Sequence, residues 1–276
     1  METKVEYELM TPDEVIAARE RTPVAFVPIG PIEWHGPHLP LGTDGIHARG
    51  VAVRAARIVG GVVLPTLYAG TETVRLPGTG AQQLGAIGFR GDERIVGMDF
   101  PHNPVKSIYY EESAFGVTVR EVVRGLKADP FRLIVLLNGH GAVNHQRTLR
   151  RIAVEETESP RVRVLYQPAW TPPQPPQSDP GHAEKWETSI LLALAEPQVK
   201  LGNLPSKDQP IRYQDYGIID GRAFDGSPAP GFLLPMDADP RYAQRDAGER
   251  ILDEEVSGVV EEVRRHLDEI RSAAGW

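Results

Sequence analysis

Short apolar runs alternate along this 276-residue chain with longer stretches of helical periodicity. The clearest run spans residues 133–137, where every side chain is apolar, as in a strand buried on both faces of a sheet. The alternation predicts an α/β fold in three layers, α/β/α, with a mostly parallel central sheet. Strands are expected at 24–30, 62–68, 133–137 and 162–166, and helices at 45–60, 111–128, 144–158, 184–196 and 249–272.

Composition narrows the classes of function that remain open. No internal repeat or clear linker interrupts the chain, which predicts a single domain over residues 1–276. A net charge of −8 argues against a nucleic-acid-binding surface. No apolar run approaches the roughly 20 residues of a membrane span, and the charged first residues do not resemble a secretory signal. A cytoplasmic location is therefore expected. The chain has no cysteine, so any metal site must use histidine and carboxylate ligands.

The first candidate site follows the apolar run at 24–30. Glu33 and His35 are two residues apart, so on extended backbone their side chains point the same way, and Asp44 follows nine residues later at the start of a helix. Carboxylates and an imidazole at the carboxyl end of a strand form part of a metal-ligand set. The alternative is structural, with Asp44 as a helix N-cap, Glu33 on the surface and His35 in the core.

Two later segments supply matching side chains. His140 lies between two glycines directly after the buried run at 133–137, although an incidental histidine in a turn would look the same. His182 precedes a helix, and histidine is a residue type suited to proton transfer near neutral pH, which Asp179 could assist by polarising the ring. Glu187 heads the apolar stripe of that helix, as a half-buried ligand or as an acid favoured by the helix dipole. Glu184 is expected on the solvated helix surface. We expect structural positions for His38 and His47. His145 is expected either to be structural or to contact the metal ligands.

Together these segments resemble the creatininase (creatinine amidohydrolase) family. The resemblance rests on three motifs in the right order, PIGPIEWHGPHLPLGTD, NGHGAVNH and GHAEKWETSILLAL, and covers residues 24–196. It implies a three-layer α/β fold, a binuclear metal centre and a ring-shaped homo-oligomer, commonly a hexamer. The segment 80–110 departs from creatininase, and the substrate is not carried over from the family.

The resemblance also implies roles for individual residues. Glu33 and His140 would bind one metal ion, His35 the other, and Asp44 would bridge the two. Creatininase has a further glutamate ligand two residues after its Asn-Gly-His histidine, where this chain has Ala142. The resemblance makes Glu187 the candidate substitute. It also implies that His182 is the catalytic histidine and Asp179 the acid three residues before it. The candidates for substrate contact are Trp170 and His38.

The sequence as a whole predicts a metal-dependent hydrolase. Two divalent ions (Zn²⁺, Mn²⁺ or Fe²⁺), roughly 3.5–4 Å apart, would activate a bridging water for attack on a C–N bond of a small cyclic amide or formamide. Two alternatives stay open. One is a C–C bond hydrolase that opens an inositol-derived cyclic diketone such as 3-dehydro-scyllo-inosose. The other is a non-catalytic metal-binding subunit of an assembly.

Overall fold

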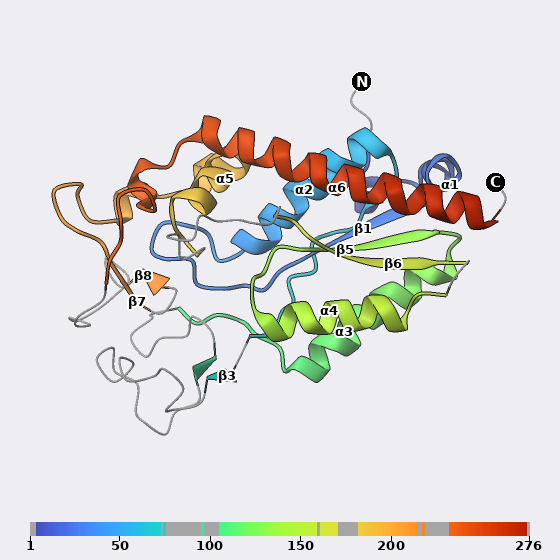
Figure 1. The fold of residues 1–276 in the computed structure, drawn as a ribbon, viewed down its shortest axis with the longest axis horizontal. Coiled ribbons are helices and arrows are strands. Elements are labelled where there is room, and N and C mark those ends of the chain that lie inside the picture. Colours follow the sequence, from blue (N-terminus) through green and yellow to red (C-terminus); the bar gives the residue numbers. More distant parts are fainter. Residues whose placement is uncertain are drawn as a thin grey trace.

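The computed structural model describes residues 4–72, 74–75, 95–96, 105–158, 161–170, 182–214, 217–218 and 232–274. Its centre is a sheet with the strand order β2-β1-β5-β6, in which every pair of neighbours is parallel (Figure 1). The two central strands pair along their full length, with Val24 opposite Leu133. The strands are β1 (Val24–Ile29), β2 (Val62–Val63), β5 (Leu133–Asn138) and β6 (Arg163–Pro168).

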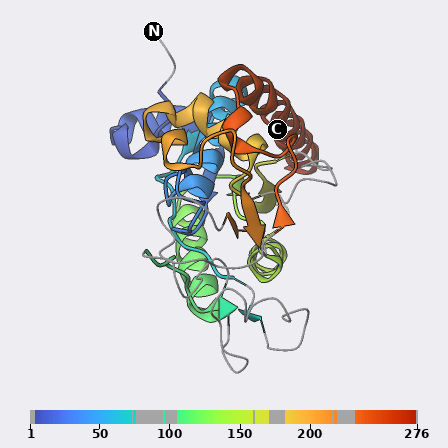
Figure 2. The ribbon, with the colours of Figure 1, turned by 90° about the vertical axis from the view of Figure 1, so that its left-hand side faces the viewer.

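Helices cover both faces of this sheet, which confirms the predicted three-layer α/β/α arrangement. One layer consists of α2, α5 and α6, and the other of α1, α3 and α4 (Figures 1 and 2). The long α6 crosses the whole first layer (Figure 1). The helices are α1 (Pro12–Arg21), α2 (Thr43–Val59), α3 (Glu112–Ala128), α4 (Val143–Glu155), α5 (Lys185–Ala195) and α6 (Arg245–Ala274).

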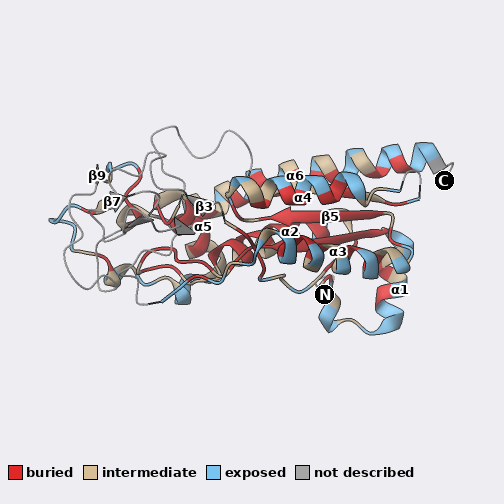
Figure 3. Ribbon diagram, turned by 90° about the horizontal axis from the view of Figure 1, so that it is seen from below, coloured by how far each residue is buried: buried red, intermediate tan, exposed pale blue. Residues whose placement is uncertain are grey.

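The two layers receive alternate residues of the same strands. In β1, Phe26 packs against the layer of α2, α5 and α6, whereas Val27 packs against the layer of α1, α3 and α4. In β5, Val135 and Leu136 divide in the same way. Because side chains alternate across a strand, a strand between two helical layers is expected to be apolar on both faces, and β5 is so up to its last residue, Asn138. All residues of β1 and β5 are buried, as the colours of Figure 3 show.

Several predicted boundaries differ from those of the structure. The second strand ends at Val63, and of its predicted remainder Leu67 forms only an isolated bridge with Ile29. Helix α1 was not predicted, although Thr11 and Glu14 form a capping box at its start that signals a helix. Short antiparallel pairs were also missed: β3 (Val74–Arg75) with β4 (Ile95–Val96), and β7 (Arg212–Gln214) with β8 (Gly217–Ile218) and β9 (Phe232–Leu233).

In the part of the chain that the structure describes, no helix has the length and apolar character needed to cross a membrane. Most of the irregular segments 71–110 and 168–181 lies outside the described residues. The single domain remains a prediction.

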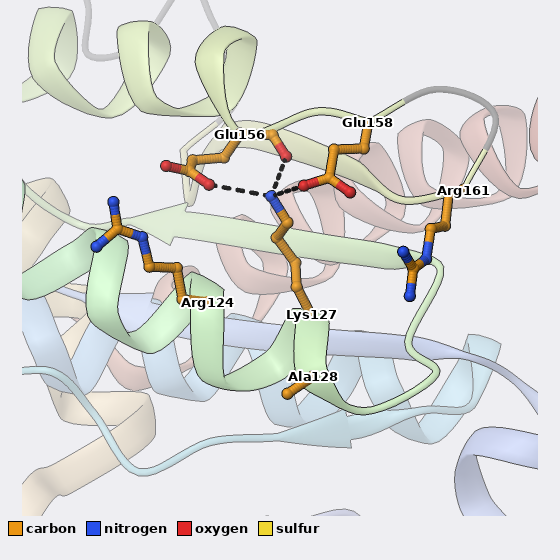
Figure 4. A pocket seen from close by; sticks show the side chains of 6 residues that line it. All are labelled: Arg124, Lys127, Ala128, Glu156, Glu158 and Arg161. Atoms are coloured by element: carbon orange, nitrogen blue, oxygen red, sulfur yellow. Dashed lines mark hydrogen bonds and ion pairs between the residues drawn. The ribbon is translucent and has the colours of Figure 1, made fainter.

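A polar pocket lies at the end of the sheet where β5 and β6 begin (Figure 4). Its central cation is Lys127, whose Nζ lies 3.1 Å from both a carboxylate oxygen and the backbone carbonyl of Glu156, and 2.5 Å from Oε1 of Glu158. Three oxygens thus surround the ammonium group. The ion pairs in this pocket connect the end of α3 to the segment between α4 and β6.

The opposite end of the sheet depends on two glycines that bring α2 close to the strand ends. A Cβ atom on Gly139, just after β5, would lie 2.1 Å from the carbonyl oxygen of Asp44. A Cβ atom on Gly30, just after β1, would lie 2.6 Å from the Cβ atom of Asp44. Real Cβ atoms do not approach backbone so closely, so only glycine leaves room for the first turn of α2 at both strand ends.

Gly139→Ala should therefore destabilise the protein, because the new methyl group must push the backbone of Asp44 away from β5. We expect the free energy of unfolding to fall by about 1–3 kcal/mol, the usual cost of overpacking, in a denaturant titration. Gly141→Ala is the matched control, since its Cβ atom would meet nothing within 4 Å. Equal stability of the two variants would contradict the close-approach argument.

Candidate metal centre

Five predicted ligands converge at the carboxyl ends of the two central strands. Glu33 and His35 follow β1, and His140 follows β5. Asp44 lies in the first turn of α2 and Glu187 in the first turn of α5. All five side chains are buried. The structure thus brings together residues that are up to 154 positions apart in the chain, from Glu33 to Glu187.

Asp44 lies at the centre of the cluster. Its Oδ1 atom is 3.1 Å from Nε2 of His35, and its Oδ2 atom is 2.9 Å from Nδ1 of His140. Two groups of potential metal-ligating atoms form around it, each with its members within 4.8 Å of one another. One group contains Glu33, Asp44 and His140, and the other contains His35, Asp44 and Glu187. A carboxylate shared by two ligand groups is the arrangement expected of a two-ion centre.

Hydrogen bonds to and from the backbone orient the His35 ring and fix the backbone of His140. The Nδ1 atom of His35 lies 3.1 Å from the backbone carbonyl of Glu33, which can only accept, so the proton belongs on Nδ1. The Nε2 atom of His35 is then free to bind a cation. For His140, the side chain of Asn138 accepts from the His140 backbone N–H and donates to its carbonyl, which fixes the turn after β5.

The buried carboxylates of the cluster require positive charge beside them. Burial raises the pKa of Glu33, but the imidazole of His140 outweighs it, so the net shift is downward. Burial lowers the pKa of His35, but the carboxylates of Glu187 and Asp44 raise it to about 10. Without a metal ion, protons on the imidazoles balance the carboxylates, because unpaired charges are costly inside a protein.

The residues also fit divalent cations. Glu33, Asp44 and Glu187 are three buried carboxylates, and neutral histidines would leave their negative charge uncompensated. Within the described residues, Oδ2 of Asp44 lacks a hydrogen-bond partner, although Nδ1 of His140 lies 2.9 Å away. A carboxylate oxygen of Asp44 that faces a ring nitrogen of His140 without a hydrogen bond is expected where both atoms bind one cation. Oxygen and imidazole ligands suit Zn²⁺, Mn²⁺ and Fe²⁺.

The start of α5 places Glu187, and here one expectation was wrong. Glu184 was expected on the helix surface, but it is fully buried and caps α5 by accepting hydrogen bonds from the backbone N–H groups of Trp186 and Glu187. The Ala183 N–H donates to Oε2 of Glu187 at 2.5 Å, and Ala183 has a φ of 56°, which is unusual for a residue with a Cβ atom. The other oxygen, Oε1, lies 3.6 Å from Nε2 of His35.

The structure also decides against one explanation of Asp44. Helix α2 begins at Thr43 with Gly42 as its N-cap, and Asp44 lies inside the first turn. The alternative explanation of Asp44 as a capping residue is therefore wrong. The helix predicted at 144–158 begins at Val143 with Ala142 as its N-cap, and the Asn144 side chain donates to the carbonyl of Glu72.

Sequence reasoning missed two side chains that touch the cluster. The Tyr109 hydroxyl donates to Oε1 of Glu33. Oε2 of Glu72 lies 3.3 Å from Nε2 of His140, on the side of the ring that faces away from Asp44. Both residues lie in the irregular stretch between β2 and α3, where no periodicity relates a position to the strand ends. We find no signal in the sequence that singles them out.

His182 also lies beside the cluster. Its Nε2 atom is 2.8 Å from the carbonyl of Trp34, which again can only accept, so Nδ1 carries the lone pair. That Nδ1 atom faces Glu33 at 4.0 Å from Oε2, and the ring packs against His35 with centroids 4.3 Å apart. Glu33, His35 and His182 form a third group of potential ligand atoms. The position suits proton transfer at Nδ1 and also suits metal ligation.

The remaining candidates lie farther out. Trp170 is half-buried just after β6, and Asp179 lies outside the described residues. His38 is buried, with Nε2 2.9 Å from the Thr188 hydroxyl, and burial lowers its pKa to about 3, so it is neutral. His145 is buried against Phe115 and edge-on to His140, consistent with the expected structural position behind the site.

Comparison with known proteins identifies the family. The family model described as creatininase, creatinine amidohydrolase, matches residues 8–84 and 96–263, which is most of the chain. The chain belongs to the creatininase family. Creatininase-family membership supports an enzyme of the amidohydrolase type. The match covers all the candidate ligands.

Two relatives match the chain over most of its length. The chain is 26% identical to the creatinine amidohydrolase of Pseudomonas putida, over 88% of this chain and 90% of the relative. It is 29% identical to the mycofactocin precursor peptide peptidase of Mycolicibacterium smegmatis, over 88% of this chain and 85% of that protein.

Solved structures confirm the creatininase-like fold. A crystal structure of creatinine amidohydrolase matches with a TM-score of 0.65 and 24% identity, over 96% of this chain and 98% of that one. A creatininase structure described as containing Mn matches with a TM-score of 0.64 and 22% identity, over 96% and 99% of the two chains. A creatininase variant described as of Zn–Zn type matches with a TM-score of 0.63 and 23% identity, again over 96% and 99%.

The raised pKa of His35 gives a pH dependence that a metal ion should remove. A group whose pKa rises on folding stabilises the protein fully below its unfolded pKa of 6.5, and this contribution is lost as pH rises through the folded pKa of about 10. Metal-free protein should therefore lose unfolding free energy between these pH values in denaturant titrations. Saturating Zn²⁺ or Mn²⁺ should flatten the loss, because a metal-bound imidazole nitrogen carries no proton. A metal-free protein with constant stability over this range would contradict the analysis.

Proposed function

We propose that this protein is a metal-dependent hydrolase that holds two divalent cations (Zn²⁺, Mn²⁺ or Fe²⁺). The observation that carries the proposal is the Asp44 carboxylate, one oxygen of which faces His35 while the other faces His140. The first cation would be held by Glu33, Asp44 and His140, and the second by His35, Asp44 and Glu187. Glu187 takes the place of the creatininase glutamate that Ala142 replaces here.

Cations bound there would polarise a substrate carbonyl and lower the pKa of bound water. The chain's own residues then have separate tasks. The Tyr109 hydroxyl and the first turn of α2 keep the carboxylates of Glu33 and Asp44 in fixed positions. His182, held at Nε2 by the carbonyl of Trp34, accepts a proton at Nδ1 and delivers it to the leaving group. Asp179, three residues upstream, is proposed to assist His182.

The substrate class that we propose is a small cyclic amide or formamide with a hydrolysable C–N bond, contacted by Trp170 and His38. A short peptide is the second candidate, because one relative is named as a peptidase and is 29% identical. Both involve amide hydrolysis. A C–C hydrolase for an inositol-derived diketone remains an alternative, and product analysis separates it. Amide hydrolysis frees a nitrogen group, either within the ring-opened product or as a separate amine, whereas ring opening of a ketone frees a carboxylate and no nitrogen group. A non-catalytic metal-binding subunit would show bound metal and no turnover of any of these compounds.

Assembly and location are carried over as further proposals. The family resemblance favours a homo-oligomer, with the hexamer as the expected form, and we propose a cytoplasmic location. A monomer in sedimentation at micromolar concentration would exclude the oligomer.

The decisive measurement is metal content by elemental mass spectrometry, on the native chain and on Glu187→Ala. We expect about two ions per native chain and a loss of metal in the variant. Turnover should fall by more than the 10–100-fold that loss of an outer-shell partner typically costs. Glu196→Ala is the matched control, because this glutamate is exposed at the other end of α5. Absence of metal from native protein never exposed to chelator would refute the proposal.

His182→Ala separates proton transfer from ligation. If His182 moves a proton, the variant keeps both ions and loses about 10²–10⁴-fold in kcat, the range typical of general acid–base groups. Metal content and kcat should be measured on the same preparation, with His266→Ala on α6 as a distant histidine control. A loss of metal as large as that of Glu187→Ala would instead identify His182 as a ligand.

A further inference from the structure

A buried ion pair lies one helical turn behind Asp44. His47, on α2, has its Nε2 atom 2.8 Å from Oε2 of Glu255, on α6. The two side chains are only 3% and 2% exposed. Neither residue belongs to the ligand groups described above. In the sequence, His47 had only a structural interpretation.

Stability alone does not account for this pair. Within the described residues, Oε1 of Glu255 has no hydrogen-bond partner, and neither does the buried indole nitrogen of Trp186, which packs next to His47. A buried ion pair with an unsatisfied oxygen is usually no more stabilising than a well-packed apolar pair. What such a pair does provide is a fixed geometry between the elements that carry it.

The elements that it joins carry two of the ligands. His47 is on the same helix as Asp44, three residues later, so its side chain lies one turn along α2. The His47 ring stands edge-on to Trp186, with centroids 5.9 Å apart at an interplanar angle of 79°. Trp186 directly precedes Glu187 in α5. The pair therefore touches the helix of Asp44 and the helix of Glu187.

Helix α6 also links the pair to α5, because the start of α6 packs closely against α5. A Cβ atom on Gly248 would lie 1.9 Å from the backbone oxygen of Ser189, so α5 and α6 are in backbone contact there. The Gln244 N–H also donates to the Ser189 hydroxyl at 3.1 Å. About two turns later, Glu255 reaches α2. Figure 1 shows α2, α5 and α6 together on one side of the sheet.

We infer that the His47–Glu255 pair is a positioning element of the metal centre. By fixing α2 to α6, while α6 is fixed to α5, it sets the separation between Asp44 and Glu187 and so shapes the ligand group of His35, Asp44 and Glu187. The other ligand group takes Glu33 and His140 from the strand ends, and its Asp44 is held against the same strand ends by the close contacts at Gly30 and Gly139, so this group should keep its geometry without the pair. The inference rests on the proposed two-ion centre.

The test is a metal titration of full-length Glu255→Leu with Zn²⁺ or Mn²⁺, followed by calorimetry and chelator competition. We expect one of the two ions to bind about 10–100-fold more weakly, the usual effect of losing an outer-shell partner, while the other keeps its native affinity. Glu254→Leu is the matched control, because Glu254 is the neighbouring residue on α6 and is exposed. Circular dichroism verifies folding.

A purely structural role predicts a different pattern, because general loosening of the fold would weaken both ions together. Should Glu255→Leu fail to fold, the double variant His47→Leu/Glu255→Leu replaces both charges with apolar groups and removes the unpaired histidine. It should fold and show the same selective loss of one ion.

The outcomes separate the two proposals. Native affinity for both ions in a folded variant, or equal weakening of both, overturns the positioning role and leaves the proposed hydrolase intact. Failure of the native chain to bind either ion overturns the proposed function and this inference with it.

Discussion

The candidate site depends on one contact, the approach of the first turn of α2 to the ends of β1 and β5. This approach places the Asp44 carboxylate between His35 and His140. It is possible only because Gly30 and Gly139 carry no side chain where the backbone of Asp44 passes. The positions of the candidate ligands after the strands and of the candidate ligand on the helix are therefore not independent. Any change that moves α2 away from the sheet separates both ligand groups at once.

Because the cluster is buried, its stability depends strongly on the charges of its side chains. The carboxylates and imidazoles lie close together and away from water. Their mutual attraction favours the charged forms, so the pKa of Glu33 is lowered and the pKa of His35 is raised. Protons can balance the carboxylates in the metal-free protein, and divalent cations can replace them. Folding, protonation and the proposed metal binding are thus linked at one place in the molecule, whereas the ion pairs around Lys127 hold the other end of the sheet with partly buried charges.

The sequence predicted the fold class because a strand between two helical layers is expected to be apolar on both faces, and the runs at β1 and β5 are. It also singled out the candidate ligands after β1, after β5 and in α5 that the structure brings together, because glutamate and histidine two residues apart on extended backbone, and a histidine between glycines, are short-range patterns. It missed Glu72 and Tyr109, which reach the cluster from irregular backbone. It also misjudged Glu184, because a buried cap and a solvated glutamate look the same before the packing of α5 is known.

The strand order β2-β1-β5-β6 has a consequence for where the chemistry can occur. From β1 the chain passes through α2 to β2 on one side, and from β5 it passes through α4 to β6 on the other, with α2 and α4 in opposite layers. Such a point, where successive connections leave a parallel sheet in opposite directions, is a topological switch point, and ligands of open α/β sheets bind there. Glu33, His35 and His140 follow the two strands that flank it. The proposed cation site therefore lies at the switch point itself, whereas Glu72 and Tyr109 reach it from a segment outside the sheet.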